Sequence, residues 1–342
     1  MAKSVFVIAI ILALSAIRST SITITERDLE TEESLKNLFD KWVADYGMEG
    51  DLDDKAKRFL VFKDNVKYIH EFNKQGHSYH LGLNQFGAMT NEEFQNMYAG
   101  GRINHRRIRR GGAIGGRYMS EKVENNISTC FDWRQKGAVN PIKDMRPCGC
   151  SGAFSAVASV ESMLFIRNVT NILLSLSEQE LVDWGFFTAG CNGSSAEASF
   201  ADIVGLGGLT MECAYPYTGK QGTCQPYFPV ANISGVELVA PNNETAFRIA
   251  VQNQPISGIF NTSCGFNTGY AVTVVGYCYT IDGNYWIVRN SLGTSWGEGG
   301  YIRMNSDFPD PRGLCGILTD PSYPTNIPSP ATSTDDHSYS VE

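Results

Sequence analysis

Apolar side chains recur three or four positions apart over residues 35–42, and again over residues 59–72. That spacing places them on one face of an α-helix. Asp51 to Asp54 interrupt the pattern and predict the boundary between two helices. We therefore expect a charged, helical region over residues 30–99.

From Asp132 onwards the sequence becomes richer in aromatic residues, glycine and cysteine. Apolar positions between Phe154 and Leu164 predict a helix that starts just after the cluster Cys148 to Ser151. Short apolar runs at 271–275, 285–288 and 301–304 are bounded by Gly and Asn, which is typical of strands. A helical part followed by a strand-rich part predicts an α+β unit of two lobes.

Three segments lack the pattern of a folded domain. Residues 1–21 hold Lys3 and an apolar run from Val5 to Ile17, which is short for a membrane span and typical of a secretory signal peptide. Residues 100–126 contain a Gly- and Arg-rich stretch and are expected to form an exposed processing linker. The tail 326–342 is rich in Pro, Ser, Thr and Asp and is expected to be disordered.

The composition narrows the possible partners and compartments. A net charge of −8 argues against nucleic acid and anionic membranes as partners. Nine cysteines in an exported chain predict disulfides and at least one unpaired thiol, in an extracellular, vacuolar or lysosomal location. Metal-binding spacing of Cys and His is lacking, so we expect neither a metal nor a cofactor. We expect a monomer. The glycosylation sequons begin at Asn126, Asn168, Asn192, Asn232, Asn243 and Asn261.

The second half of the chain also carries a series of short motifs in one order. They are DWRQKGAV at 132–139, CG at 148–149, SLSEQELVD at 175–183, CNG at 191–193, AVTVVGY at 271–277 and GEGGY at 297–301. Together they resemble the papain-like cysteine proteases, in particular the plant group of bromelain and actinidain. The resemblance implies a papain-like two-lobe fold over residues 127–325, with a helical left lobe and a β-barrel-like right lobe.

Upstream residues resemble the inhibitory propeptide of the same family. The positions that fit its helix motif are Arg58, Phe62, Asn65, Ile69 and Asn73. Asp54 stands where a Glu is usual, and Ala88 replaces an Asp of the second propeptide motif. The resemblance implies an inhibitor-type propeptide domain over residues 30–99 that binds the rest of the chain.

The departures from the family pattern are concentrated at the catalytic positions. Ser151 takes the place of the nucleophilic Cys, and Tyr270 takes the place of the His. Met145 replaces the Gln that helps to form the oxyanion hole, and only Asn290, which orients the His, is kept. The histidines of the chain are His70, His77, His80, His105 and His337, so none lies in the expected peptidase domain. Gly152 and Leu292 replace two tryptophans of the family site.

Each exchange removes part of the chemistry. A serine hydroxyl needs a base before it can attack, and a tyrosine with an ordinary pKa near 10 is a poor proton acceptor. Methionine offers no donor to a developing oxyanion. We therefore expect an inactive family member whose cleft still binds peptides, proteins or cystatin-like inhibitors. The alternative is an active endopeptidase with unusual residues, for example with Cys150 as the nucleophile.

The resemblance also implies a disulfide pattern. Two family bridges would join Cys148 to Cys191 and Cys264 to Cys315. A third family bridge would join position 184 to Cys224, but Trp184 occupies that position, so Cys213 is the other candidate partner. No partner is assigned to Cys130, Cys150 and Cys278. Between Pro255 and Cys264 the chain is shorter than the family pattern by about a strand, which would leave a gap in the sheet.

Overall fold

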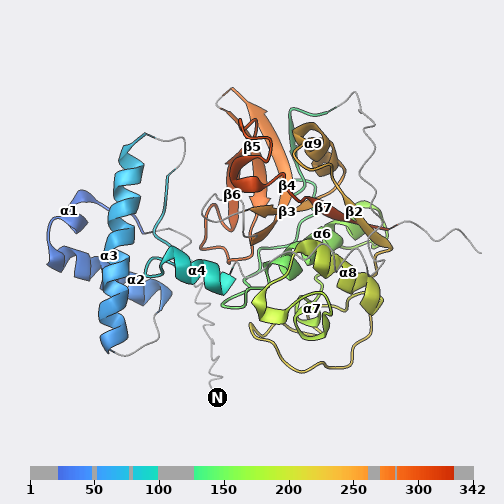
Figure 1. Cartoon of the computed structure of the whole chain (residues 1–342), viewed down its shortest axis with the longest axis horizontal. Coiled ribbons are helices and arrows are strands. Elements are labelled where there is room, and N and C mark those ends of the chain that lie inside the picture. Colours follow the sequence, from blue (N-terminus) through green and yellow to red (C-terminus); the bar gives the residue numbers. More distant parts are fainter. Residues whose placement is uncertain are drawn as a thin grey trace, which may run out of the picture.

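The computed structural model describes residues 22–47, 52–76, 80–98, 127–260, 270–281 and 283–326. The predicted signal peptide, the processing linker and all but the first residue of the predicted tail lie outside these residues. Figure 1 shows a small helical unit, residues 22–98, beside a larger mixed unit, residues 127–326. Among the described residues, no helix combines the length and the apolar character that a membrane span requires.

The small unit is built on two helices that pack against each other through aromatic side chains. Helix α2 begins after Thr31, whose side chain accepts a hydrogen bond from the Ser34 amide and so satisfies one free donor of the first turn. The apolar faces predicted from the sequence pack together, with Phe39 and Trp42 against Phe62. The helices of the unit are α1 (Glu26–Leu29), α2 (Glu32–Tyr46), α3 (Leu52–Lys74) and α4 (Asn91–Tyr98).

The helical lobe of the larger unit surrounds one buried helix. Helix α6 starts at Ser151, the last residue of the cluster after which the sequence predicts a helix, and its residues from Ser151 to Leu164 are all buried. The neighbouring helix α8 is capped by the Ser195 side chain, which accepts from the Ala198 amide, and it ends at Gly207 in the left-handed conformation. The helices of the lobe are α6 (Ser151–Ile166), α7 (Gln179–Trp184) and α8 (Ala196–Leu206), with the short turn η1 (Gly190–Asn192).

The second lobe is an antiparallel sheet with helix α9 (Glu244–Asn253) beside it. Its strand order is β2-β7-β3-β4-β5-β6, and β1 pairs with β4 off this path. The strands are β1 (Cys130–Asp132), β2 (Gly235–Leu238), β3 (Ile256–Phe260), β4 (Tyr270–Thr280), β5 (Gly283–Arg289), β6 (Tyr301–Asn305) and β7 (Ser322–Thr325), and η2 (Leu314–Gly316) precedes β7. The predicted strands at 271–275, 285–288 and 301–304 are confirmed. The expected gap is closed because β3 pairs with β4 on one side and with β7 on the other.

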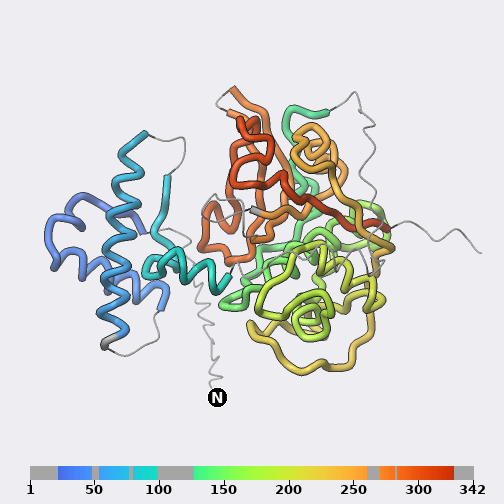
Figure 2. The backbone as a smooth tube through the Cα atoms, in the orientation of Figure 1, coloured from blue at the N-terminus to red at the C-terminus, as the bar shows by residue number. Residues whose placement is uncertain are grey.

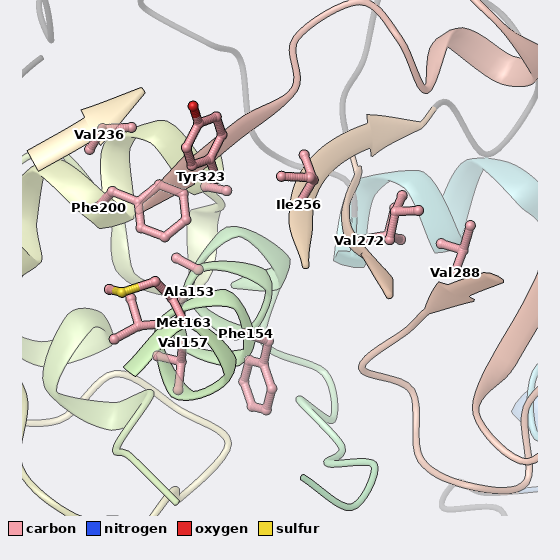
Figure 3. Close-up of a cluster of buried hydrophobic side chains, with 14 of the residues drawn as sticks. Ala153, Phe154, Val157, Met163, Phe200, Val236, Ile256, Val272, Val288 and Tyr323 are labelled. Carbon is pink, nitrogen blue, oxygen red and sulfur yellow. The ribbon is translucent and has the colours of Figure 1, made fainter. Parts of the chain in front are cut away.

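The two lobes meet where α6 packs on the sheet. Figure 3 shows Phe154 and Val157 of α6 in the core region that also holds Val272 of β4 and Ile256 of β3. Small polar residues allow the close approach: Ser155 Oγ donates to the Val272 carbonyl oxygen at 2.7 Å. Buried polar groups need such partners, so this contact fixes the start of α6 relative to β4.

Candidate functional site

Ser151 lies at the first turn of α6 and faces β4. The Cys148–Cys191 disulfide and the hydrogen bond from the Gly149 amide to the Cys191 carbonyl oxygen hold the loop before it. Only 2% of Ser151 is exposed, and its Oγ accepts a hydrogen bond from the Ala271 amide at 3.1 Å. The hydroxyl is therefore engaged by a backbone donor, which takes electron density from the oxygen that would have to attack.

Tyr270 and Asn290 form the second half of the site. The Tyr270 hydroxyl donates to Asn290 Oδ1 at 2.7 Å, and the Ser291 amide donates to the same oxygen at 2.7 Å. Asn290 Nδ2 is buried without a hydrogen-bond partner among the described residues. Complete burial raises the pKa of Tyr270 well above its usual range. The raised pKa favours the protonated phenol, whose hydroxyl donates to Asn290, and both features make Tyr270 a poor proton acceptor.

Met145 and Cys150 both contact Tyr217 of the helical lobe. Met145 is fully buried, and its backbone oxygen accepts from the Tyr217 hydroxyl at 2.7 Å. The same hydroxyl lies 3.1 Å from Cys150 Sγ. Burial raises the pKa of the Cys150 thiol to about 12, although the contact with Tyr217 acts in the other direction. Cys150 thus interacts with the helical lobe, whereas Ser151 interacts with β4, as expected of neighbours at a helix start.

The two lost tryptophan positions are accommodated by packing. A Cβ atom added at Gly152 would lie 2.3 Å from the Ser194 carbonyl oxygen, so a larger side chain does not fit there without a shift of that backbone. Leu292 is 2% exposed and lies in the core. The space around the catalytic positions is therefore closed by the chain itself.

Residues 85–98, which we call the docking segment, lie across these catalytic positions. Figure 2 shows the backbone of this segment running from the small unit to the larger one. The Phe94 ring stacks on Tyr270, with 6.3 Å between ring centroids and 27° between planes. Gln85 Nε2 donates to the Leu292 carbonyl oxygen at 2.8 Å, and Ser295 Oγ bonds to Gln85 Oε1 at 3.0 Å.

The residues that resemble a propeptide motif position this segment. Asn65 Nδ2 donates to the carbonyl oxygens of Gly87 and Met89 at 2.9 and 3.0 Å. Asn73 makes a reciprocal pair with the backbone of Leu81. Through such bonds α3 fixes the path of the chain before α4, although neither side chain touches the larger unit directly in these contacts.

The disulfide predictions are confirmed in part. Cys148 and Cys191 are bonded, and Cys315 is disulfide-bonded too, while its predicted partner Cys264 lies outside the described residues. The pairing of Cys213 with Cys224 is wrong, because both thiols are free and exposed. Cys224 Sγ donates instead to the Asp183 carbonyl oxygen at 3.0 Å.

A further disulfide, Cys130–Cys278, was not found by sequence reasoning. Its two residues face each other across the β1–β4 pair. They are 148 positions apart in the sequence, and only the sheet register brings them together. The register of a short strand such as β1 leaves no local signal that could have revealed the bond.

The sequon asparagines differ in accessibility. Asn168, Asn192 and Asn232 are exposed, whereas Asn243 is half-buried and caps α9 by accepting from the Ala246 amide. Asn126 and Asn261 lie outside the described residues. Exposure favours the first three as acceptors, which stay predictions.

A buried ionic cluster behind the site was also missed. Lys143 Nζ lies 2.8 Å from Glu178, 3.5 Å from Glu161 and 3.8 Å from Glu212. Burial raises the pKa of Glu178 to about 8, although Lys143 opposes the rise. Nearby, burial raises the pKa of Glu180 to about 7. Isolated glutamates in a helical sequence usually face solvent, so only the fold reveals this cluster.

Both units of the chain match known protein families. Residues 127–325 match the family described as papain family cysteine protease, and residues 39–94 match the cathepsin propeptide inhibitor domain. The chain belongs to the papain family of cysteine proteases. The small unit is accordingly its propeptide domain, and this propeptide binds the papain-like peptidase domain of the same chain.

Relatives and solved structures agree with this assignment. The chain is 45% identical to the thiol protease SEN102 of Hemerocallis over 95% of its own length and 96% of the relative. It is 43% identical to vignain of Ricinus communis over 93% of both chains. The proform of the ragweed pollen cysteine protease Amb a 11 superposes with a TM-score of 0.81 at 35% identity, over 90% of this chain and 99% of that one. The α+β papain-like fold with a helical propeptide domain is thus confirmed.

Proposed function

We propose that this papain-family chain does not hydrolyse peptides and that its peptidase domain acts by binding. One observation carries the proposal: the hydroxyl of Tyr270, at the base position, donates a hydrogen bond to Asn290, and burial raises the pKa of this phenol. Tyr270 therefore offers Ser151 no base, no other acceptor for the Ser151 proton is found in the part of the chain that the structure describes, and a serine without a base is a very weak nucleophile.

The remaining features act in the same direction. In a comparable triad the loss of nucleophile or base removes about six decades of kcat, with little further loss when both are absent. The apolar side chain of Met145 offers no oxyanion donor, a loss that costs about 3 to 4 kcal/mol of transition-state stabilisation. Substrate positioning alone cannot compensate for losses of this size, so we expect no useful rate of hydrolysis.

The alternative is an active endopeptidase with non-standard residues. Similarity to a thiol protease and to vignain favours it, and Cys150 would then be the nucleophile. Its thiol is 1% exposed, however, and its pKa of about 12 leaves very little thiolate at neutral pH. The geometry supports the binding function better.

The test combines turnover with covalent labelling. Purified protein, cut in the linker, is incubated with a fluorogenic peptide, and a parallel sample is treated with iodoacetamide or an epoxide inhibitor and mapped by mass spectrometry. We expect background hydrolysis, with labelling of the exposed Cys213 and Cys224 at least about 100-fold faster than labelling of Cys150. Turnover that is blocked in proportion to labelling at Cys150 would overturn the proposal.

We further propose the biological setting and the limits of the domains. The boundaries are 1–21 for the signal peptide, 30–99 for the propeptide, 100–126 for the linker, 127–325 for the peptidase domain and 326–342 for the tail. Disulfides and the similarity to a relative named KDEL-tailed cysteine endopeptidase support passage through the secretory pathway, ending outside the cell or in a vacuole or lysosome. The proposed ligands of the peptidase domain are peptides, proteins and cystatin-like inhibitors, in competition with its own propeptide.

A further inference from the structure

The propeptide domain divides between two separate hydrophobic cores. Helices α1 to α3 share a core of their own, which contains Phe39, Trp42 and Phe62. Tyr98, at the end of α4, belongs instead to the core of the peptidase domain, and Phe86 and Phe94 pack against that same core. The docking segment is thus shared: its aromatic residues pack with the peptidase domain, whereas Ala88 packs in the core of the propeptide.

An aromatic chain links the docking segment to the former catalytic position. Phe94 contacts Tyr98 at 4.9 Å and Phe86 at 5.1 Å, measured between ring centroids. The Phe94–Tyr270 stack extends this chain into β4. Aromatic pairs at these distances contribute attraction beyond the burial of their area.

Polar and backbone contacts surround the aromatic chain. Gln85 bridges the Leu292 carbonyl oxygen and the Ser295 hydroxyl. At the other end, a Cβ atom added at Gly149 would lie 2.9 Å from the Met97 carbonyl oxygen, so the backbone after Phe94 runs directly against the loop before Ser151. The docking segment is therefore held on both sides of the catalytic positions.

We propose that Tyr270 is an anchoring residue for the docking segment, and that the propeptide stays bound as the resident ligand of the peptidase domain after the linker is cut. The inference rests on the proposed function, because it names the occupant of the same non-hydrolytic site. An imidazole at position 270 would be smaller and more polar than the phenol, and would offer Phe94 less apolar ring surface. The same side chain that removes the base thus supplies a contact surface.

The experiment measures retention of the propeptide in the full chain. A cleavage sequence for a specific protease is inserted between residues 106 and 110, the secreted protein is cut, and the sample is diluted to nanomolar concentration. Fragment dissociation is followed by size-exclusion chromatography and by the loss of energy transfer between labels on the two fragments. We expect the cut wild-type fragments to elute together, and Tyr270→His to dissociate about 3- to 10-fold faster.

Control variants separate anchoring from folding. Tyr270→Phe keeps the ring and removes the bond to Asn290, so it should dissociate at nearly the wild-type rate. In a double-mutant cycle, Phe94→Leu and Tyr270→His should be non-additive, since each removes the same stack. A purely structural role for Tyr270 would give additive effects and would contradict the proposal. So would immediate release of the propeptide from cut wild-type protein.

A peptide assay on the same samples separates the two claims. Release of the propeptide without hydrolysis would overturn only the anchoring role of Tyr270. Hydrolysis by the cut protein, whether or not the fragments separate, would overturn the proposed function.

Discussion

The docking segment of the propeptide lies directly against the catalytic centre, yet the two regions differ in how far their residues match the family pattern. At the docking surface, Asn65 and Asn73 make the backbone bonds through which α3 shapes the incoming chain. At the catalytic centre, Asn290 is in place, but it orients a phenol in place of an imidazole. The residues that shape the docking segment thus match the family pattern, whereas the residue that Asn290 orients does not.

This difference shows how separable binding and catalysis are in one site. Catalysis needs a nucleophile, a base and an oxyanion donor that act as a unit, so a single exchange removes most of the rate. Binding is distributed over many contacts, such as the Phe94–Tyr270 stack and the Gln85 bridge, and each contributes only a part. Under the proposed function, the exchanges at Ser151 and Tyr270 remove catalysis and leave binding, to which Tyr270 adds its stack with Phe94.

The largest effect is expected when the chemistry is rebuilt. The triple variant S151C/Y270H/M145Q restores nucleophile, base and oxyanion donor, and we expect peptide hydrolysis at least about 1,000-fold above the wild type after the linker is cut. The matched control S151C should stay at background, because it has a thiol without a base. Equal activity of S151C and the triple variant would contradict this comparison, because the missing base would then not limit the rate of hydrolysis.

A second prediction concerns pH. The folded-state pKa of Glu178 is raised by burial to about 8 from 4.5, so between these values the folded protein holds a proton that the unfolded chain releases. Its stabilising contribution is therefore present at pH 5 and is lost as pH rises through 8, and Glu180 acts in the same direction. We expect the free energy of unfolding to fall by at least about 1 kcal/mol between pH 5 and pH 8.5.

Denaturant unfolding at several pH values measures this effect. Glu178→Gln keeps the shape and an acceptor for Lys143 but removes the titration, so its profile should be flatter than that of the wild type. This result would locate the pH response behind the catalytic positions. Equal slopes for the two proteins would show that other groups cause it.

The smallest effect is expected within the propeptide. Asn65→Ala leaves the carbonyl oxygens of Gly87 and Met89 without their donor, and because the site is only part-buried this should destabilise the docking segment by about 0.5 to 1 kcal/mol. Hydrogen exchange of the α4 amides measures the loss. Lys67→Ala, at an exposed position of the same helix, is the control and should leave protection unchanged. Unchanged exchange in Asn65→Ala would mean that the peptidase domain alone holds the segment.

The sequence predicted most of the fold because the pattern was long and consistent. Helical spacing over 35–42 and 59–72 and the strand runs near 271, 285 and 301 correspond to elements of the structure. Sites that depend on distant pairing were not predictable in this way. The Cys130–Cys278 bond, the free Cys213 and Cys224 and the ionic cluster around Lys143 all depend on which strands and loops become neighbours.

The amino-acid sequence by itself determined which side chains stand at the reactive positions: the peptidase domain contains no histidine, and Ser151 and Tyr270 replace the nucleophile and the base of the family pattern. Only the tertiary structure decided where the proton of Tyr270 points, how completely Cys150 is buried and which ring covers Tyr270. The physical reason is that residue identity limits the available chemistry, whereas hydrogen-bond direction, desolvation and ring contact arise from groups brought together by long-range packing.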